Sequence, residues 1–158
     1  MQLFCRVISD PLDQVKLSFN ENQVGFQSRN AEIFARLIDG EFPRYTTVLL
    51  SEVDNVMEAD REMFTRKLRL VSNVTSDDTK AVRLKMGRNE LELYGKSVGR
   101  GEATAHVEVT VPGDEADIAF NPDYVLDGLK HAETDTVRLE FNERTSPGKF
   151  CLGENFIY

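Results

Sequence analysis

The chain has 158 residues, which is the length of roughly one domain at ~100–200 residues each. Because 41% of the residues are hydrophobic and 29% are charged, the composition excludes an intrinsically disordered chain. Its net charge of −8 arises almost wholly in residues 101–158, which carry 12 acidic and 4 basic side chains, so the bulk field of that part repels nucleic acid. No apolar run approaches the ~18 residues of a membrane span, and the start of the chain lacks a signal-peptide pattern, so we expect a cytoplasmic protein.

The first predicted elements are the end of a helix and a hairpin. Residues 2–8 are expected to form the last turns of a helix. Residues 15–22 alternate apolar and polar side chains and run into turn residues, and residues 23–26 alternate again, so the two segments predict a β-hairpin. The same pattern recurs at residues 82–94 and 137–152, which indicates a repeated hairpin unit.

A helix is predicted from Asp60 to about Val74. Asp60 is a suitable N-cap, and three apolar side chains fall at i, i+4 and i+7 to form one stripe: Phe64, Leu68 and Val71. Arg66 and Arg69 point away from that stripe, whereas Lys67 lies beside it. Residues 61–69 hold four cations against one anion. On the sequence alone, an ordinary solvated helix face explains these cations at least as well as a binding surface does.

The last third of the chain predicts two further strands and a second helix. Residues 103–111 form a strand that would be an edge in an isolated domain, and residues 117–120 form a strand that leads into the helix. Asn121 is the N-cap of this helix, Pro122 is its first residue, and its core face is formed by Val125, Leu126 and Leu129. The order of elements predicts an α+β fold with antiparallel sheets and two helices per domain on one face.

The motifs typical of catalysis and metal binding are missing from the sequence. Gly95-Lys96-Ser97 resembles the end of a phosphate-binding loop, but Glu90 stands where such a loop needs a glycine, so we expect a loop between strands. His106 and His131 have no nucleophile placed beside them, and the two cysteines have no partner at zinc-ligand spacing. The sequence therefore predicts a binding or scaffolding protein that is not an enzyme and needs no cofactor or metal.

Two ten-residue segments carry a resemblance to a known family. Residues 36–45 (RLIDGEFPRY) resemble the most recognisable segment of the bacterial sliding clamp, the beta subunit of DNA polymerase III. Residues 118–127 (IAFNPDYVLD) resemble the strand-to-helix entry of the third domain in that family. The order of the intervening elements agrees as well, so the resemblance covers nearly the whole chain and implies the DNA-clamp fold.

The resemblance implies a function and a division of the chain. In this family each subunit has three similar domains, and two subunits close a ring around duplex DNA as a processivity factor that tethers the replicative polymerase. The polymerase and the clamp loader bind it through a short peptide motif. Residues 1–46 would be the second half of the middle domain and residues 51–158 the third domain without its last few residues, so we expect a fragment. The alternative is a free-standing, clamp-derived module that binds or inhibits a protein and does not encircle DNA.

The resemblance also implies three groups of site residues. The partner-peptide pocket is expected to contain Pro43, Thr47, Val48, Thr79, Asn121, Tyr124, Thr145 and Pro147. The side chains that face DNA are expected to be Arg66, Lys67 and Arg69, and the subunit interface of the homodimer is expected at Leu70 and His106. Thr47 stands where some relatives have a basic residue and Thr79 where some have an aromatic one, which would change the depth or selectivity of the pocket.

Overall fold

The chain consists of two compact units. The structure, a computed structural model, describes residues 6, 14–41, 44, 52–75, 80–110, 115–154 and 157. The first unit comprises residues 1–44 and the second comprises residues 45–158. Of the helix predicted at residues 2–8, only Arg6 is described, and it is helical.

The first unit holds an antiparallel three-stranded sheet in the order β1 (Lys16–Phe19), β2 (Gln23–Gln27) and β3 (Glu32–Arg36). The predicted hairpin of β1 and β2 is confirmed, since Phe19 pairs with Val24 across the turn. The sequence does not predict β3, because its centre is a run of three apolar residues that hides the alternation of a half-buried strand.

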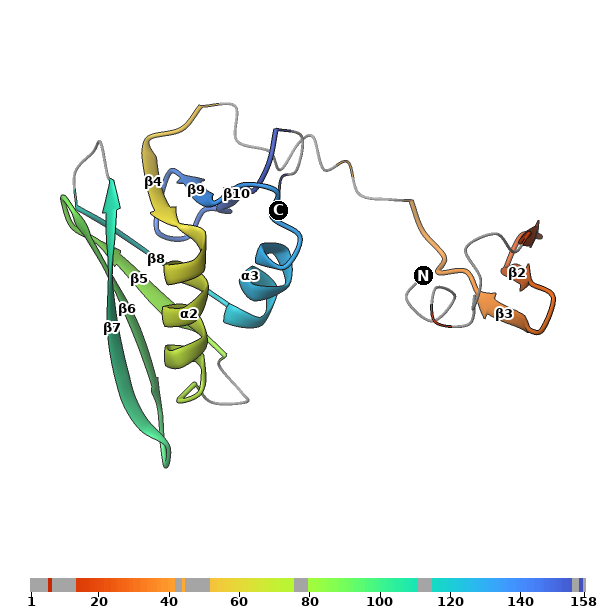
Figure 1. The fold of residues 1–158 in the computed structure, drawn as a ribbon, viewed down its shortest axis with the longest axis horizontal. Coiled ribbons are helices and arrows are strands. Elements are labelled where there is room, and N and C mark those ends of the chain that lie inside the picture. The colour runs from red at the N-terminus through yellow and green to blue at the C-terminus, as the bar shows by residue number, and fades with distance from the viewer. Residues whose placement is uncertain are drawn as a thin grey trace. The chain divides into compact units, whose positions relative to one another are not determined.

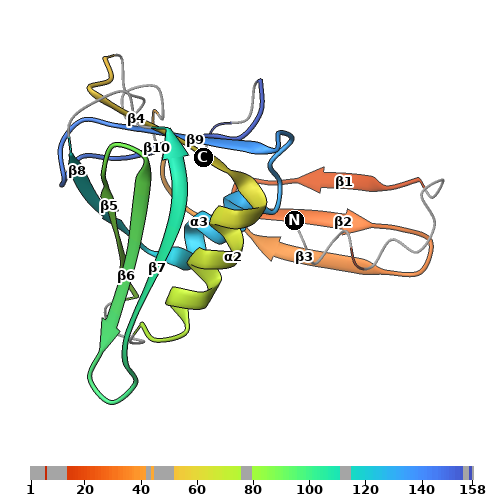
Figure 2. The same cartoon turned by 60° about the vertical axis from the view of Figure 1, so that its left-hand side comes forward.

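The second unit is built on one antiparallel seven-stranded sheet and two helices (Figures 1 and 2). The strands are β4 (Asn55–Asp60), β5 (Val82–Met86), β6 (Glu90–Ser97), β7 (Gly101–Thr110), β8 (Ala116–Phe120), β9 (Thr136–Phe141) and β10 (Lys149–Cys151), in the sheet order β10-β9-β4-β7-β6-β5-β8. The helices are α2 (Arg61–Ser72) and α3 (Pro122–Leu129). The sheet curls around the helices, which pack together on one of its faces. The predicted α+β architecture is confirmed.

The core lies between the curled sheet and the helices. Buried side chains alternate with exposed ones along β5. The predicted apolar stripe of α2 is fully buried, at Phe64, Leu68 and Val71. The strand side chains Val82, Leu84, Met86, Leu91 and Leu93 are buried as well. On α3, Val125 and Leu129 are buried and Leu126 is partly buried. Each large apolar side chain that is removed from water contributes about 1.5–3 kcal/mol.

Both helices begin at the predicted residues. Asp60 Oδ1 accepts a hydrogen bond from the backbone N–H of Met63 at 2.7 Å, and Asn121 Oδ1 accepts one from the N–H of Asp123 at 3.0 Å. These bonds satisfy amide groups that no preceding turn can bond, and Pro122 has no amide hydrogen to satisfy. The local sequence therefore fixes where each helix starts.

The strand β4 is an addition to the predicted architecture. It pairs with β9 along its whole length, from Asn55 opposite Phe141 to Asp60 opposite Thr136. The six residues of β4 contain only two buried side chains, so the alternation is too short to mark a strand in the sequence.

The segment Gly95-Lys96-Ser97 is not the predicted loop. It forms the end of β6, where Gly95 pairs with Ala103 and Ser97 with Gly101. The chain turns only at residues 98–100. The prediction is wrong because a glycine usually interrupts strands, whereas Gly95 here gives α2 room to pack against the sheet.

The strand around His106 is an edge over most of its length. Within the described residues, β7 pairs with β6 from Gly101 to Glu108, and only Val109 and Thr110 pair with β4 on the other side. The edge predicted at residues 103–111 therefore holds for residues 103–108. It is wrong for Val109 and Thr110, because β4 joins the two halves of the sheet there, and Val111 lies outside the described residues.

Two further properties concern the whole described part of the chain. No helix in the described part of the chain combines the length and the apolar character needed to cross a membrane. Cys151 is a free, half-buried thiol, and burial together with the nearby Glu140 carboxylate raises its pKa. Cys5 lies outside the described residues.

Candidate functional site

A basic groove runs between α2 and α3. It has a volume of about 570 Å³ and is lined by Arg61, Glu62, Thr65, Arg66, Arg69, Leu126, Leu129 and Lys130. Four of these side chains are cations and one is an anion, whereas the chain as a whole carries a net charge of −8. The groove is therefore a local basic surface on an acidic protein, and a phosphate group is the kind of ligand that it attracts.

The cations of this groove differ in whether a carboxylate already neutralises them. Arg61 pairs with Asp135 at 3.2 Å and Lys130 pairs with Asp127 at 3.0 Å. Arg66 and Arg69 have no such partner within the described residues, and the nearest polar contact of the Arg66 guanidinium is Met63 Sδ at 3.3 Å.

The structure thus brings two of the three predicted DNA-facing residues into one groove. Arg66 and Arg69 are exposed there and carry charges that remain available to an anion. Lys67 is half-buried and does not line the groove, as its position beside the apolar stripe predicts.

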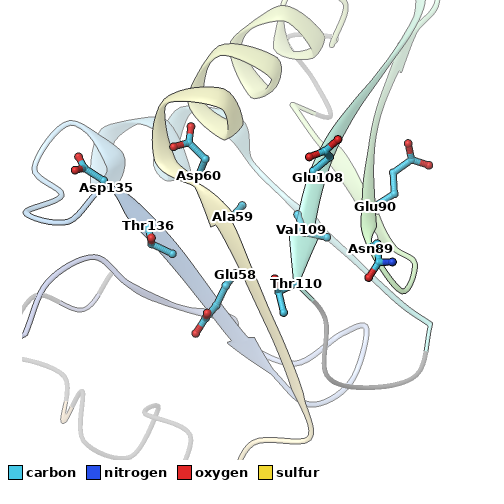
Figure 3. Close-up of a pocket in the computed structure, with 10 residues that line it drawn as sticks. All are labelled: Glu58, Ala59, Asp60, Asn89, Glu90, Glu108, Val109, Thr110, Asp135 and Thr136. Atoms are coloured by element: carbon cyan, nitrogen blue, oxygen red, sulfur yellow. The ribbon is translucent and has the colours of Figure 1, made fainter.

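A second cavity, of about 780 Å³, is acidic. It opens where β4 and β7 diverge beyond their two paired residues (Figure 3). Its titratable lining residues are all carboxylates: Glu58, Asp60, Glu90, Glu108 and Asp135. No group of three His, Cys, Asp or Glu residues within the described ranges could hold a metal ion. This cavity repels phosphate and leaves the basic groove as the better nucleic-acid surface.

Flanking side chains bind most of these carboxylates. Glu58 pairs with Arg138 at 3.3 Å, and Glu90 lies 3.3 Å from Nδ1 of His106. Asp60 is occupied as the N-cap of α2. The sequence does not predict this acidic cavity, because its lining residues come from four separate stretches of the chain that only the strand pairing in the sheet brings together.

The start of α3 carries two of the residues predicted for the partner-peptide pocket. Tyr124 is 65% exposed, so its ring is open to a partner. Asn121 caps the helix, which makes its side chain a structural element here. Lys80 Nζ pairs with Asp123 Oδ2 at 3.0 Å and thereby ties the chain before β5 to the first turn of α3.

The loop between β9 and β10, residues 142–148, carries two more of them. Thr145 and Pro147 are both exposed. The loop is folded by hydrogen bonds between Glu143 and Ser146 in both directions, at 3.1 and 3.0 Å. Gly148 lies so close to Phe120 that an added Cβ would collide with the aromatic ring. Because Phe120 directly precedes the cap of α3, this contact places the loop beside the helix that carries Tyr124.

Four predicted pocket residues lie outside the described residues: Pro43, Thr47, Val48 and Thr79. The structure therefore describes Asn121, Tyr124, Thr145 and Pro147 alone from the predicted group. Thr145 and Pro147 lie near α3, because Gly148 in the same loop contacts Phe120, which precedes that helix.

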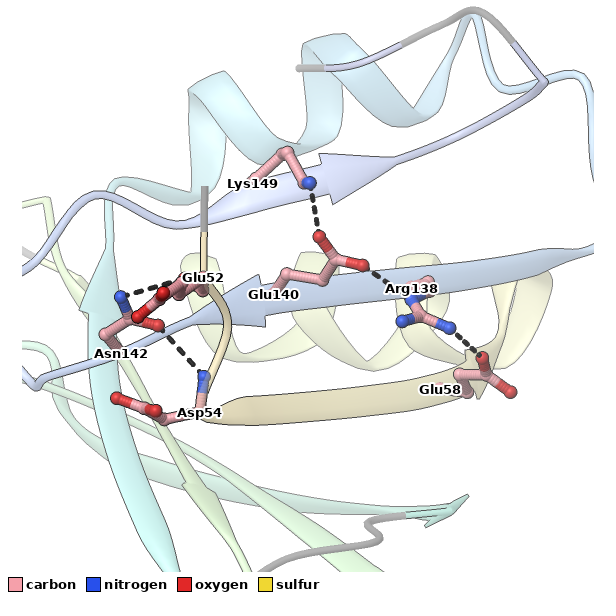
Figure 4. Close-up of polar contacts among 7 residues, drawn as sticks. All are labelled: Glu52, Asp54, Glu58, Arg138, Glu140, Asn142 and Lys149. Atoms are coloured by element: carbon pink, nitrogen blue, oxygen red, sulfur yellow. Dashed lines mark hydrogen bonds and ion pairs between the residues drawn. The ribbon is translucent and has the colours of Figure 1, made fainter. Parts of the chain in front are cut away.

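A buried ion network lies on the strands that lead to this loop (Figure 4). The side chain of Glu140 is 9% exposed and accepts hydrogen bonds from Arg138 Nε at 2.8 Å and from Lys149. Burial alone raises the pKa of Glu140, but the bonds from Lys149 and Arg138 outweigh it, so the pKa lies below its usual value. Arg138 also pairs with Glu58 and thus connects β9 to β4. Glu140 connects β9 to β10 through Lys149.

The two residues predicted for the subunit interface are both exposed. Leu70 on α2 is 55% exposed, whereas Phe64, Leu68 and Val71 of the same helix are buried. The side chain of His106 is half exposed beside Glu90, on the part of β7 that has a free edge. An exposed leucine and a free strand edge are features that proteins commonly cover.

Comparison with known proteins gives a consistent result. Residues 46–155 match the family model described as DNA polymerase III beta subunit, C-terminal domain. The chain is 27% identical over 150 residues to the beta sliding clamp of Haemophilus influenzae, which covers 95% of this chain and 40% of that protein. It is 30% identical over 140 residues to the beta sliding clamp of Streptomyces coelicolor, which covers 85% of this chain and 37% of that protein.

Solved structures of sliding clamps share the fold. The clamp of Bartonella birtlesii bound to griselimycin superimposes with a TM-score of 0.80 at 22% identity, over 96% of this chain and 41% of that one. The clamp of Pseudomonas aeruginosa bound to griselimycin gives a TM-score of 0.75 at 22% identity, over 95% and 41%. The chain spans about 40% of the length of the curated relatives. Since the family model covers most of this chain, the chain belongs to the DNA polymerase III beta subunit family and contains the C-terminal domain of that family.

Proposed function

We propose that this chain is part of a ring-shaped sliding clamp, a non-catalytic processivity factor that encircles duplex DNA and holds the replicative polymerase on it. The observation that carries this proposal is the basic groove between α2 and α3 in a chain that is otherwise acidic. A ring that moves along DNA requires contacts to phosphates without reading of base sequence, and exposed arginines on a helix surface can supply such contacts.

The division of the chain follows from the same proposal. Residues 1–46 contribute the second half of the middle domain, and residues 51–158 contribute the third domain. The family match over residues 46–155 and the compact unit of residues 45–158 support this division. A replication protein of this kind works in the cytoplasm of a bacterium.

Topological retention on DNA tests the ring directly. The complete natural protein that contains this sequence, loaded by its clamp loader, should stay on nicked circular DNA and should leave once that DNA is cut open. A protein that binds DNA only by contact stays bound to both forms. Equal retention on circular and cut DNA contradicts the ring and favours the free-standing, clamp-derived module.

We infer that the surface around Tyr124, Thr145 and Pro147 binds the partner peptide of the polymerase and clamp loader, together with Pro43, Thr47, Val48, Thr79 and Asn121. An exposed tyrosine offers an apolar ring with a hydroxyl group, and peptide sites are commonly apolar surfaces with a few polar groups. Griselimycin is bound in two of the solved clamps, and we propose that it occupies this same surface, which makes it a suitable probe. In the complete protein we expect Tyr124→Ala to weaken its binding at least tenfold, or about 1.4 kcal/mol, in a calorimetric titration, while the 158-residue chain alone should bind poorly. Unchanged affinity would place the site elsewhere.

We further propose that the complete protein is a homodimer whose interface includes Leu70 and His106. The exposed Leu70 side chain and the free edge of β7 support this assignment. A strand of a second subunit can pair with that edge, and apolar contacts at Leu70 can close the interface.

A further inference from the structure

The side chain of Asn142 joins the end of β9 to the chain that enters β4 (Figure 4). Its Oδ1 accepts a hydrogen bond from the backbone N–H of Asp54 at 3.0 Å, and its Nδ2 donates one to the backbone oxygen of Glu52 at 3.1 Å. Its own backbone oxygen accepts a third from Asn55 Nδ2 at 2.6 Å. Asn142 is thus bonded to three residues that lie almost 90 positions earlier in the sequence.

The geometry explains why an asparagine stands at this position. The β4–β9 ladder ends with Asn55 opposite Phe141, so Asn142 lies one residue beyond the last pair. A carboxamide offers one acceptor and a donor, as a peptide group does. The side chain of Asn142 therefore extends the ladder, while the backbone is free to turn away into the loop of residues 142–148.

The other contacts of the loop show how its position is fixed. Arg144 Nε lies 3.5 Å from Asp117 Oδ1 on β8, and Gly148 packs against Phe120 at the end of the same strand. Asn142 is the attachment on the opposite side, to the chain before β4. The exposed residues Thr145 and Pro147 lie between these attachments, so their position depends on both.

We propose that Asn142 is a positioning residue of the partner-peptide site: by holding the start of the loop against residues 52–55, it sets where Thr145 and Pro147 lie relative to Tyr124. This inference rests on the proposed partner-peptide function. Asn142 does not touch the peptide itself. It acts by limiting the positions that the loop samples before binding, and preorganisation of that kind raises affinity without adding contacts.

Griselimycin titration of matched variants of the complete protein tests the proposal, because the 158-residue chain alone is expected to bind poorly. Asn142→Ala removes both side-chain hydrogen bonds and should weaken griselimycin binding by about fivefold or more. Asn142→Asp keeps the acceptor for the Asp54 amide and loses the donor to Glu52, so its affinity should lie between those of Asn142→Ala and the unchanged chain. The titration is made at a temperature where every variant is folded, since a loss of stability alone then leaves the affinity unchanged.

Arg138→Ala is the matched control. It breaks contacts to Glu58 and Glu140 on the same strand pair but lies away from the loop, so it should lower the melting temperature and keep griselimycin affinity within about twofold. Amide hydrogen exchange at Asp54 should accelerate in Asn142→Ala and stay unchanged in Arg138→Ala.

The possible outcomes separate this inference from the proposed function. Griselimycin binding that depends on Tyr124 but is equal in Asn142→Ala and the unchanged chain overturns the positioning role alone. An equal loss of affinity in Asn142→Ala and Arg138→Ala overturns it too, because the effect is then general loosening. Griselimycin binding that is absent from the complete protein, or that is indifferent to Tyr124→Ala there, overturns both the partner-peptide site and the positioning role.

Discussion

Val71 on α2 lies directly over Gly95 on β6. A Cβ built on Gly95 would come within 2.8 Å of Val71 Cγ1 and 3.0 Å of the Val71 backbone oxygen. The helix therefore sits against the strand at a separation that only glycine permits. This close approach determines how far α2, and with it Arg66 and Arg69, lies from the sheet.

The first prediction concerns this close approach. Gly95→Ala should lower the free energy of unfolding by about 1–3 kcal/mol, because the added methyl group forces the helix or the strand to move. Gly87→Ala is the control, since its Cβ would meet nothing closer than the Glu90 oxygen at 3.4 Å. Urea denaturation of both variants gives the comparison, and equal stability of the two would show that α2 adjusts freely.

The second prediction concerns the buried carboxylate Glu140. Its pKa is lower in the folded protein than usual, so it contributes stability that is present above the unfolded-state pKa of about 4.3 and is lost as the pH falls through the folded value. Glu140→Gln should lower the free energy of unfolding by about 1–3 kcal/mol at neutral pH, since Lys149 and Arg138 lose their partner.

The pH dependence of that difference provides the check. The gap in unfolding free energy between the unchanged chain and Glu140→Gln should narrow as the pH falls below about 4.3, because the unfolded chain then takes up a proton at this carboxylate that the folded chain does not yet bind. A gap that stays constant from neutral pH down to about pH 3 contradicts the low pKa assigned to Glu140.

The third prediction concerns assembly. The proposed homodimer pairs the surface of Leu70 and β7 with the first domain of the other subunit, so the 158-residue chain should sediment as a monomer. In the complete protein, Leu70→Asp should weaken the dimer about tenfold or more, since it places a charge in an apolar interface. Ala119→Asp adds the same charge on the distant strand β8 and should leave the dimer intact. A tight symmetric dimer of the 158-residue chain contradicts the assignment.

The sequence predicts the parts of the fold that local interactions decide. Only a few neighbouring residues determine the helix caps at Asp60 and Asn121, and the structure confirms both caps. The same is true of the apolar stripe on α2, formed by Phe64, Leu68 and Val71. By contrast, β4 is recognisable only from its pairing with β9. Gly95 predicts a loop when only the sequence is considered, because the sequence does not show that α2 packs against this residue.

The candidate sites divide in the same way. The exposed faces of Arg66 and Arg69 follow from helical periodicity, which is a local property. The pairing of Lys130 with Asp127, three residues earlier, is local as well. The pairing of Arg61 is not local, because it depends on where Asp135 lies in space. The hydrogen bonds of Asn142 cannot be predicted from the sequence either, since its partners precede it by about 90 residues.

The central claim is that the groove between α2 and α3 faces DNA, and the salt dependence of DNA binding tests it most directly. The complete protein and its Arg66→Ala/Arg69→Ala variant are titrated with duplex DNA over a range of salt concentrations. Lys85→Ala/Lys96→Ala is the control, because it removes the same charge from strand positions that point away from the helices. We expect the slope of log affinity against log salt to fall by about 0.9 for each phosphate that the arginine variant no longer neutralises, with no change in sequence preference. A slope that is unchanged in the arginine variant, or that falls equally in the lysine control, contradicts a groove that faces DNA.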